Sequence, residues 1–495
     1  MALNRHSNCT RVPPGRERCK ISFNCWAQKK MNKKTLYVKS GKRNMMKTTF
    51  YLLLVIMCAG SFSCKKPAAK LAFDVNSAAL LHQNQHQLNQ VIIYDVFTPP
   101  VASRIYAYTS LAFYEAARFI DPQYPSLTAQ LHGFDPMPVP DSSKKYNYYL
   151  AATRAFFDVT HKVVFSIDSL KKYENSVYAA FEEQMKKEDF DNSLALGARI
   201  ADNILKRAAN DNYKKTRGMP KYLGSNEDGK WQPTSPDYMD GIEPYWGAIT
   251  PLFLDSARQC AVYTSPPFST DKNSAFYKNA LEVYDMSKNL TDSQKLTIYY
   301  WDDNPFVMEH SGHMMFANKK ITPGGHWMGI AGIAAKKANA DVVFTAQTYA
   351  LTAISLLESF ISCWETKYQS EVIRPITYIN KVIDERWEPV LQTPPFPEYP
   401  SGHSAISAAA STMLTTLYGE NFSFHDDSDK EYIGMERSFT SFYEAAHEAA
   451  MSRVYGGIHY TSGMEGGIEQ GKNVAKLLVE NLKVKNDLTA VALRK

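Results

Sequence analysis

The sequence lacks the features of several large protein classes. Of its 7 cysteines, only Cys260 and Cys363 follow Cys64. Two cysteines are too few for a disulfide framework, and the chain has no CxxC pair that would suggest a structural zinc site. A single disulfide between the two is an alternative, but two free buried thiols are expected.

Signals for β-sheet are also missing, because no stretch alternates apolar and polar residues over the length of a strand. Apolar residues instead recur with the helical spacing i, i+3, i+4 and i+7. The predicted helices cover residues 102–119, 145–165, 169–186, 192–209, 274–287, 327–373 (as two helices), 401–418, 437–455 and 464–482. The expected fold class is therefore all-α, with helical bundles.

Three segments are predicted to lie outside these helices. Residues 210–272 are rich in Pro, Gly, Asp and Tyr, which is typical of a long ordered loop with short helices. Five prolines in 387–400 exclude helix there and favour an extended approach to residue 401. The acidic segment 425–429 lacks the spacing of a calcium loop and is expected to be a solvated loop.

The net charge of +6 arises at the N-terminus. Residues 1–45 hold 12 Lys and Arg against one acid, Glu17, a balance of +11 that leaves −5 for the rest of the chain. The body of the protein is thus mildly acidic, and no nucleic-acid partner is expected.

Residues 45–64 resemble the leader of an exported bacterial lipoprotein. A short apolar run is followed by small residues and Cys64, and it is shorter than the ~20 residues of a usual membrane span. We expect residues 45–63 to be a signal peptide and Cys64 to carry a lipid anchor in the cell envelope, with an uncleaved signal anchor as the alternative. Residues 1–44 are interpreted as a non-native or disordered basic extension.

The remainder of the chain is divided by position. Residues 64–77 are predicted to be a tether, 78–300 an N-terminal helical half and 301–495 a C-terminal helical half. The residues with the most chemical character all fall in the last third of the chain, so the C-terminal half is expected to carry the site.

Two of the charged segments there are predicted to converge. Lys367 and Arg374 are seven residues apart, nearly two helical turns, so both are expected on one side of a helix that Pro375 ends. Ser401 resembles an N-cap, and the free N–H groups of the helix turn after it favour an anion. Gly402 allows the backbone to approach such a ligand closely.

The third segment supplies another cation and a second histidine. Arg453 and His459 would lie on different sides of an unbroken helix, but Gly456 and Gly457 can end the helix and turn the chain. His459 can then face the same cavity as Arg453 and His403. Arginine binds a tetrahedral oxyanion through two donors, and lysine adds a point charge. The segments together predict a cage for phosphate or vanadate with two histidines beside it.

The segments KYQSEVIRP, YPSGH and SRVYGGIH resemble the three signature motifs of the phosphatidic-acid-phosphatase type 2 superfamily, which unites acid and lipid phosphatases with vanadium-dependent haloperoxidases. Trp364 and Phe396 are similar to the aromatic residues that line the halide side in the bacterial haloperoxidase branch. The segments WDDNPF at 301–306 and GGHW at 324–327 also look like that branch. The family's third motif usually ends with an aspartate that orients its last histidine, whereas this chain has Gly463; Glu465 or a backbone carbonyl is the expected substitute.

The resemblance implies a vanadate-dependent haloperoxidase that oxidises iodide, or bromide, with hydrogen peroxide to hypohalous acid. It implies that His459 ligates vanadium, that His403 relays protons and that Lys367 polarises the bound oxygen. The vanadate oxygens would be held by Lys367, Arg374, Ser401, Gly402 and Arg453. One alternative is a phosphatase without vanadate that forms a phosphohistidine at His459. A second alternative, favoured by Gly463, is a non-catalytic anion-binding envelope protein.

A second group of histidines comprises His310, His313 and His326. The His-x-x-His spacing could hold a metal, but no acid or cysteine lies at helical spacing nearby. We expect these residues to be structural or to line the rim of the cavity.

Overall fold

The computed structural model describes residues 71–305, 308–311, 314–317 and 320–485. The helices of the first part are α2 (Ala78–Tyr94), α3 (Pro99–Ala117), α4 (Tyr148–Val163), α5 (Ile167–Glu182), α6 (Lys187–Ala209), α7 (Tyr213–Thr216), α8 (Ala275–Lys288) and α9 (Asp292–Tyr300). Those of the second part are α10 (Pro323–Lys337), α11 (Val342–Ser370), α12 (Pro375–Val382), α13 (Gly402–Tyr418), α14 (Lys430–Ile433), α15 (Phe442–Tyr455) and α16 (Thr461–Asn481). The all-α prediction is confirmed.

In the described part of the chain, four short strands form two antiparallel pairs that the sequence did not predict. Strand β1 (Met308–Ser311) pairs with β2 (Met314–Ala317), and β3 (Phe424–Asp426) pairs with β4 (Arg437–Phe439). With three or four residues each, these strands are too short to produce an alternating pattern over strand length.

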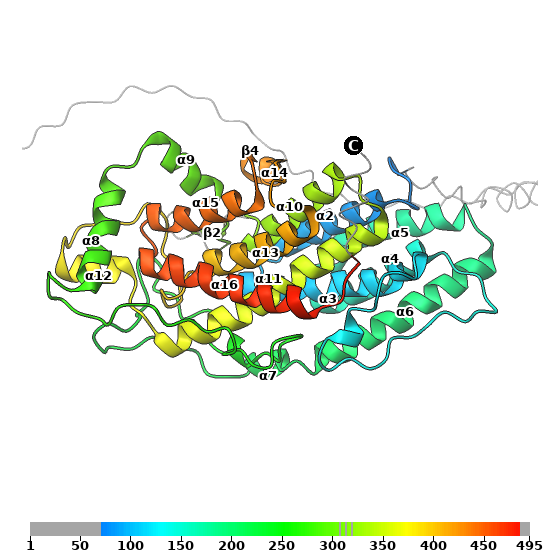
Figure 1. Ribbon diagram of the computed structural model, residues 1–495, viewed down its shortest axis with the longest axis horizontal. Helices are drawn as coiled ribbons and strands as arrows, with labels where there is room; N and C mark the ends of the chain where they lie inside the picture. Colours follow the sequence, from blue (N-terminus) through cyan, green and yellow to red (C-terminus); the bar gives the residue numbers. More distant parts are fainter. Residues whose placement is uncertain (1–70, 306–307, 312–313, 318–319, 486–495) are drawn as a thin grey trace, which may run out of the picture. The chain divides into compact units, whose positions relative to one another are not determined.

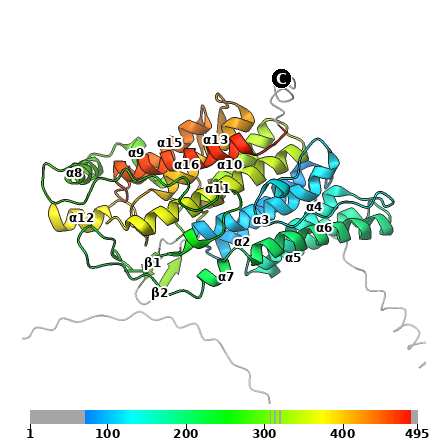
Figure 2. The ribbon, with the colours of Figure 1, turned by 60° about the horizontal axis from the view of Figure 1, so that its bottom comes forward.

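Helix α11 lies at the centre of the fold. On one side it packs against α3, which in turn contacts α4 and α6. On the other side it packs against α13, which contacts α15 and α16 (Figures 1 and 2). One hydrophobic core extends across this series, from Leu81 on α2 to Leu482 after α16. The predicted halves 78–300 and 301–495 therefore share a core.

Glycines on α16 bring it against α13. A Cβ atom added at Gly471 would lie 1.9 Å from the carbonyl oxygen of Ala405, and one at Gly467 would lie 2.6 Å from that of Ser401. Only glycine allows backbones to approach this closely. The contact fixes the N-terminus of α13, where Ser401 and Gly402 lie, against the first half of α16.

Every predicted helix is present, with ends shifted by at most five residues, and the long ordered loop over 210–272 is confirmed. Glu358 of α11 anchors this loop by accepting the N–H groups of Leu252 at 2.6 Å and Leu254 at 2.9 Å. Burial raises the pKa of Glu358 to about 7. Helices α2, α9, α12 and α14 were not predicted.

One prediction about the site's local structure is wrong. Lys367 and Arg374 do not share a helix, because α11 ends at Ser370 and Glu371 takes a left-handed conformation with φ 53°. Pro375 is the first residue of α12, a position where its fixed φ and missing N–H are tolerated. Arg374 precedes α12 in an extended conformation, and the turn between the two helices directs it inward.

The structure bears on some of the N-terminal predictions. Cys260 and Cys363 are free and buried, as expected. Val75, near the end of the predicted tether, is buried against Leu80 and Leu150 and so belongs to the folded part. Among the described residues no helix has the length and apolar character to cross a bilayer. The predicted extension, signal peptide and Cys64 lie outside the described residues.

Candidate active site

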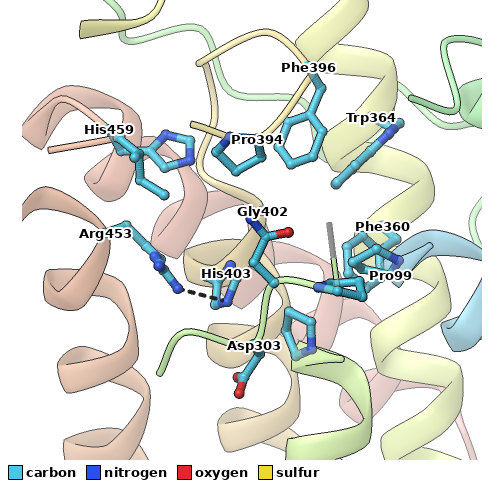
Figure 3. A pocket seen from close by; sticks show the side chains of 14 residues that line it. Pro99, Asp303, Phe360, Trp364, Pro394, Phe396, Gly402, His403, Arg453 and His459 are labelled. Carbon is cyan, nitrogen blue, oxygen red and sulfur yellow. Dashed lines mark hydrogen bonds between the residues drawn. The ribbon is translucent and has the colours of Figure 1, made fainter. Parts of the chain in front are cut away.

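The N-terminus of α13 lies beside a small cavity (Figure 3). Six of the residues predicted for the site line it: Trp364, Phe396, Gly402, His403, Arg453 and His459. Ser401 caps the helix by accepting the N–H of Ser404 at 3.4 Å, which confirms the predicted N-cap. The positive end of the α13 dipole is therefore directed at the cavity.

The two glycines after α15 bring His459 to this cavity, as predicted. Helix α15 ends at Tyr455, and Gly457 turns the chain with φ +76°, a conformation that side chains other than glycine rarely adopt. The N–H of Ile458 then bonds to the carbonyl of Arg453 at 3.2 Å. Arg453 and His459 consequently line the same cavity from opposite sides of the turn.

Arg374 lies behind His459 and is fully buried. Its Nε donates to the carbonyl of Phe396 at 2.8 Å, and its Nη1 donates to the carbonyl of Ile458 at 2.7 Å and lies 3.2 Å from His459 Nε2. Its Nη2 is buried and has no hydrogen-bond partner among the described residues. Arg374 therefore has one unused donor group at the site.

Lys367 is also fully buried, and its ammonium group donates hydrogen bonds to backbone oxygens. The Nζ also lies 5.1 Å from the centre of the Phe396 ring and 5.7 Å from that of Trp364. The Nζ donates to the carbonyls of Pro397 at 3.0 Å and Glu398 at 2.9 Å, and also to that of Pro400. A lysine has three N–H donors, so all are in use. To bind an oxyanion, Lys367 has to exchange one of these carbonyls for it.

Arg453 connects the two sides of the cavity. Its Nη1 donates to the carbonyl of Trp301 and lies 3.1 Å from His403 Nε2, while Nη2 lies 3.9 Å from Asp302 Oδ1. The Nε group is buried without a partner among the described residues. Because an arginine only donates, Nε2 of His403 must be the acceptor and the ring is neutral. Burial and then Arg453 hold the pKa of His403 well below its usual value.

His459 is oriented by a residue that the sequence did not identify. Its Nδ1 lies 2.8 Å from Glu398 Oε1, so neither Glu465 nor a backbone carbonyl is the partner. Burial raises the pKa of Glu398 to about 7, against the opposing effect of Arg374 and Lys367. Burial, followed by Arg374 and Lys367, lowers the pKa of His459 well below its usual value. The neutral ring donates from Nδ1, and its unprotonated Nε2 accepts from Arg374 Nη1 at 3.2 Å.

Aromatic side chains form the opposite wall of the cavity (Figure 3). The rings of Trp364 and Phe396 lie 5.1 Å apart, and Phe360 packs against Trp364 at 5.2 Å. Trp364 is held in place by its indole N–H, which donates to the carbonyl of Ile242 at 3.2 Å. This wall has little capacity to hydrate an ion, because it offers ring faces in place of hydrogen-bonding groups.

The sequence missed other residues that line the cavity. Pro99 comes from α3, far from the three motifs in the chain, and Asp303 and Asn304 follow α9. The segment 301–306 was noted only for its resemblance to the haloperoxidase branch. No local signal links Pro99 to the site, because its contribution depends on the packing of α3 against α11.

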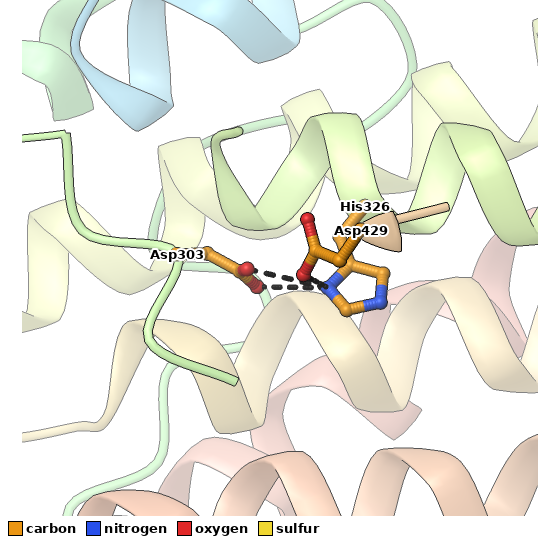
Figure 4. Close-up of side chains that lie close together, drawn as sticks. All are labelled: Asp303, His326 and Asp429. Atoms are coloured by element: carbon orange, nitrogen blue, oxygen red, sulfur yellow. Dashed lines mark hydrogen bonds and ion pairs between the residues drawn. The ribbon is translucent and has the colours of Figure 1, made fainter. Parts of the chain in front are cut away.

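His326 lies at the centre of a buried acidic cluster next to the cavity (Figure 4). Its Nδ1 lies 3.2 Å from Asp303 and 3.3 Å from Asp429, and its Nε2 lies 3.0 Å from Asp426. Burial opposes protonation of the ring, but these carboxylates outweigh it and raise the pKa of His326 well above its usual value. The cluster is thus a buried ion-pair network built around an imidazolium.

This cluster corrects one prediction and shows neighbours of His326 that the local sequence does not reveal. Residues 425–429 do not form a solvated loop, since Asp426 and Asp429 are buried. His326 does have acidic neighbours, and these come from segments distant in the sequence. Asp303, His326 and Asp429 could together approach one metal ion. Protonated His326 offsets one negative charge of the cluster, and burial raises the pKa of Asp429 to about 8, so this carboxyl holds a proton at neutral pH. The side chains of His310 and His313 lie outside the described part of the chain.

The donor groups of the site fit a tetrahedral oxyanion. Two buried N–H groups, Arg374 Nη2 and Arg453 Nε, lack partners among the described residues. A buried donor without an acceptor is costly, so an anion that reaches both would be bound favourably. At Gly402 an added Cβ would lie 3.1 Å from the Trp364 ring, so the helix end approaches the cavity without a side chain.

Lys367 makes anion binding depend on pH. Burial lowers its pKa to about 7, so above neutral pH the free protein holds an uncharged amine. A bound dianion stabilises the ammonium form, and binding above pH ~7 must therefore take up a proton at this residue. We expect the affinity for tungstate, which remains a dianion at alkaline pH, to fall up to about tenfold per pH unit above 7.

Isothermal titration calorimetry at several pH values measures this effect. In Lys367→Met the affinity should be lower at pH 6 and should fall less steeply above pH 7, because one proton fewer is taken up. Equal slopes for the two proteins would show that Lys367 does not supply the proton-linked charge.

Comparison with known proteins adds to this geometry. A family model described as the VCPO second helical-bundle domain matches residues 347–486. The solved structure of a bacterial vanadium-dependent iodoperoxidase is similar at 43% identity and TM-score 0.79, covering 84% of this chain and 99% of that chain.

More distant structures share the fold. The holo form of a bacterial vanadium-dependent chloroperoxidase is 16% identical with TM-score 0.61, and the match covers 83% of this chain and 98% of the chloroperoxidase chain. The apo form of such an enzyme is 18% identical with TM-score 0.62, covering 82% of this chain and 98% of its own. No curated protein matches the chain.

Proposed function

Because this chain belongs to the vanadium-dependent haloperoxidases, we propose that it oxidises iodide, with bromide as the second choice, to hypohalous acid at the expense of hydrogen peroxide. The observation that carries this proposal is the pairing of a cationic cage with an aromatic wall in one cavity. The relative that is 43% identical is named an iodoperoxidase, which agrees with the choice of iodide.

Each side of the cavity has a separate role. Arg374 and Arg453 present unpaired N–H groups, and Gly402 adds the N-terminus of α13. Trp364 and Phe396 form a wall of ring faces. Such a wall removes water from a large polarisable anion at low cost but would desolvate a strongly hydrated phosphate ester unfavourably. The aromatic wall thus favours iodide over a phosphate ester.

The residues present fit a bound vanadate. His459 would ligate the metal through Nε2, which is unprotonated because Nδ1 donates to Glu398, in exchange for its present contact with Arg374 Nη1. Lys367, Arg374 and Arg453 would balance the charge of the oxygens, with the backbone of Ser401 and Gly402. Vanadate, when bound, supplies a Lewis acid that activates hydrogen peroxide toward halide.

Two residues would handle protons and charge during turnover. His403 is neutral, and its Nε2 would relay a proton between peroxide and product after exchanging its contact with Arg453 at 3.1 Å. Lys367 would polarise the reacting oxygen after exchanging one of its three carbonyl contacts. Lys367 is fully buried and His403 is half-buried beside the cavity, where a charge interacts strongly with the reacting atoms.

Glu398 also bears on the alternative of a non-catalytic anion binder. That alternative depended on Gly463, which leaves the usual position of the orienting carboxylate empty. Since Glu398 contacts His459 Nδ1 at 2.8 Å, the histidine does not lack a carboxylate partner.

The test is an iodide-oxidation assay on the purified protein after incubation with orthovanadate. We expect peroxide-dependent triiodide formation, lost on chelation of vanadate and abolished in His459→Ala. Absence of iodide and bromide oxidation, together with vanadate-inhibited phosphate release from a model ester, would instead support the phosphohistidine phosphatase. Full activity in His459→Ala would refute the assigned site.

A further inference from the structure

The histidine that faces the cage is held by a carboxylate from an unexpected part of the chain. Glu398 lies in the proline-rich segment before α13, and its Oε1 accepts from His459 Nδ1 at 2.8 Å and from the N–H of Tyr460 at 3.1 Å. Both side chains are buried, with 0% exposure for Glu398 and 3% for His459. The two contacts fix the position of the carboxylate relative to the chain that carries the histidine.

Gly463 is matched to this carboxylate. It lies in the first turn of α16, and a Cβ atom added there would be 2.1 Å from Glu398 Oε1 and 2.8 Å from both Cδ and Oε2. All three of these nearest atoms belong to Glu398. Gly463 does not need the conformational freedom of glycine, because its φ lies outside the left-handed region. Its lack of a side chain is therefore explained by the space that Glu398 occupies.

We propose that Glu398 is the positioning residue of His459 and that Gly463 is glycine in order to admit it. The carboxylate that the superfamily places on the helix after the last histidine is supplied here from the segment before α13. The inference rests on the proposed function only in taking the cage as the vanadate site.

The arrangement of the ring supports a positioning role over a purely structural one. With Nδ1–H donated to Glu398, the lone pair of Nε2 points to the side where Arg374 Nη1 lies at 3.2 Å. Glu398 Oε2 is buried without a hydrogen-bond partner among the described residues. Burying a carboxylate with one oxygen unpaired is costly, which argues against stability as its main purpose.

According to the proposal, the effect of a substitution at residue 463 on vanadate affinity depends on the side chain at residue 398. Glu398→Ala should weaken vanadate binding about 10–100-fold, the usual effect of losing the partner of a ligating histidine. Gly463→Asp alone should also weaken binding, because its side chain displaces Glu398. The double variant Glu398→Ala with Gly463→Asp should bind more tightly than Glu398→Ala, since the carboxylate returns from the helix. Such a rescue is not expected of a residue that only fills space.

Equilibrium dialysis of the full-length protein against orthovanadate measures these affinities, with circular dichroism to check folding. Glu358→Gln is the matched control, because Glu358 is equally buried but accepts backbone N–H groups far from the cage. It should leave the affinity for vanadate unchanged. If the Gly463→Asp protein does not fold, Gly463→Ala replaces it, and should weaken binding when Glu398 is present but not alongside Glu398→Ala.

A second measurement separates this inference from the proposed function. Nitrogen-15 NMR of histidine-labelled protein without any anion, assigned with His459→Ala, should show the Nδ1–H tautomer of His459 in the native protein and its loss in Glu398→Ala. If the native protein fails to bind vanadate, the proposed function is wrong, and the tautomer still decides the role of Glu398. An Nε2–H tautomer, or equal vanadate affinity in Glu398→Ala and the native protein, would overturn the inference.

Discussion

Substitution of Arg453 with lysine is expected to lower kcat/KM for iodide oxidation by about 10²–10³-fold, although the positive charge is kept. Arg453 contacts the carbonyl of Trp301 and His403 Nε2 with one nitrogen and leaves Nε free for an oxyanion. A lysine ammonium is a point donor on a flexible stem and cannot span these groups together. Steady-state kinetics after incubation with vanadate measures kcat/KM, and dialysis measures how much vanadium the variant binds.

Arg104→Lys is the matched control for this substitution. Arg104 is a buried arginine on α3 that pairs with Asp211 at 2.6 Å. Its replacement tests whether losing a buried arginine outside the cage lowers activity simply by destabilising the fold. We expect this variant to keep kcat/KM for iodide while melting at a lower temperature. A value for Arg453→Lys within threefold of the native protein would show that charge alone, and not the shape of the guanidinium, is needed at residue 453.

Helical periodicity predicted most of the fold because the helices of the core have continuous apolar faces. Helix α2 was missed for a physical reason: Asn84, Gln85 and Asn89 lie on its buried face and interrupt the apolar pattern. These residues are buried by contacts with helices that are distant in the sequence. Such contacts cannot be predicted from the residues of one segment. The all-α class followed from the other helices and did not depend on α2.

The residues of the cage could be predicted because short sequence segments determine how most of them are placed. Ser401 caps a helix that begins at the next residue, and Gly457 turns the chain between Arg453 and His459 within one short segment. The path from Lys367 to Arg374 was predicted incorrectly as one helix, yet both side chains are buried at the site. Charge and spacing identified the residues of the cage. The conformation of the backbone between Lys367 and Arg374 could be seen only in the structure.

The partners of the histidines were not predictable, because each comes from a distant part of the chain. Glu398 is 61 residues before His459, and Asp426 is 100 residues after His326. The only sequence signal for Glu398 was the missing side chain at Gly463, which indicated that a carboxylate had moved but not where. The acidic composition of 425–429 was misleading, since those carboxylates are buried by their contact with His326.

The His326 cluster leads to the largest expected effect on stability. His326→Ala should lower the free energy of unfolding by about 3–5 kcal/mol at pH 6, because removing the cation of a buried network leaves carboxylates uncompensated. Asp303, Asp426 and Asp429 would then remain buried without the imidazolium. Urea denaturation with an unchanged m value measures the difference.

The effect of His326 should also depend on pH in a defined direction. Its pKa in the folded protein is raised well above the unfolded value of 6.5, so the folded state holds the proton more tightly. The stabilisation is therefore fully present below pH 6.5 and is lost as the pH rises through the folded pKa. The deficit of His326→Ala should be greatest on the acid side and shrink at alkaline pH.

His425→Ala is the matched control for the histidine cluster. His425 is the residue before Asp426, but it is exposed, and among the described residues it pairs with Ser438 at 2.9 Å and Glu436 at 3.5 Å. Exposed pairs of this kind contribute little, so the variant should unfold at nearly the same urea concentration as the native protein. If His326→Ala were as mild as His425→Ala, the three buried carboxylates would have to be held by protons and not by the imidazolium.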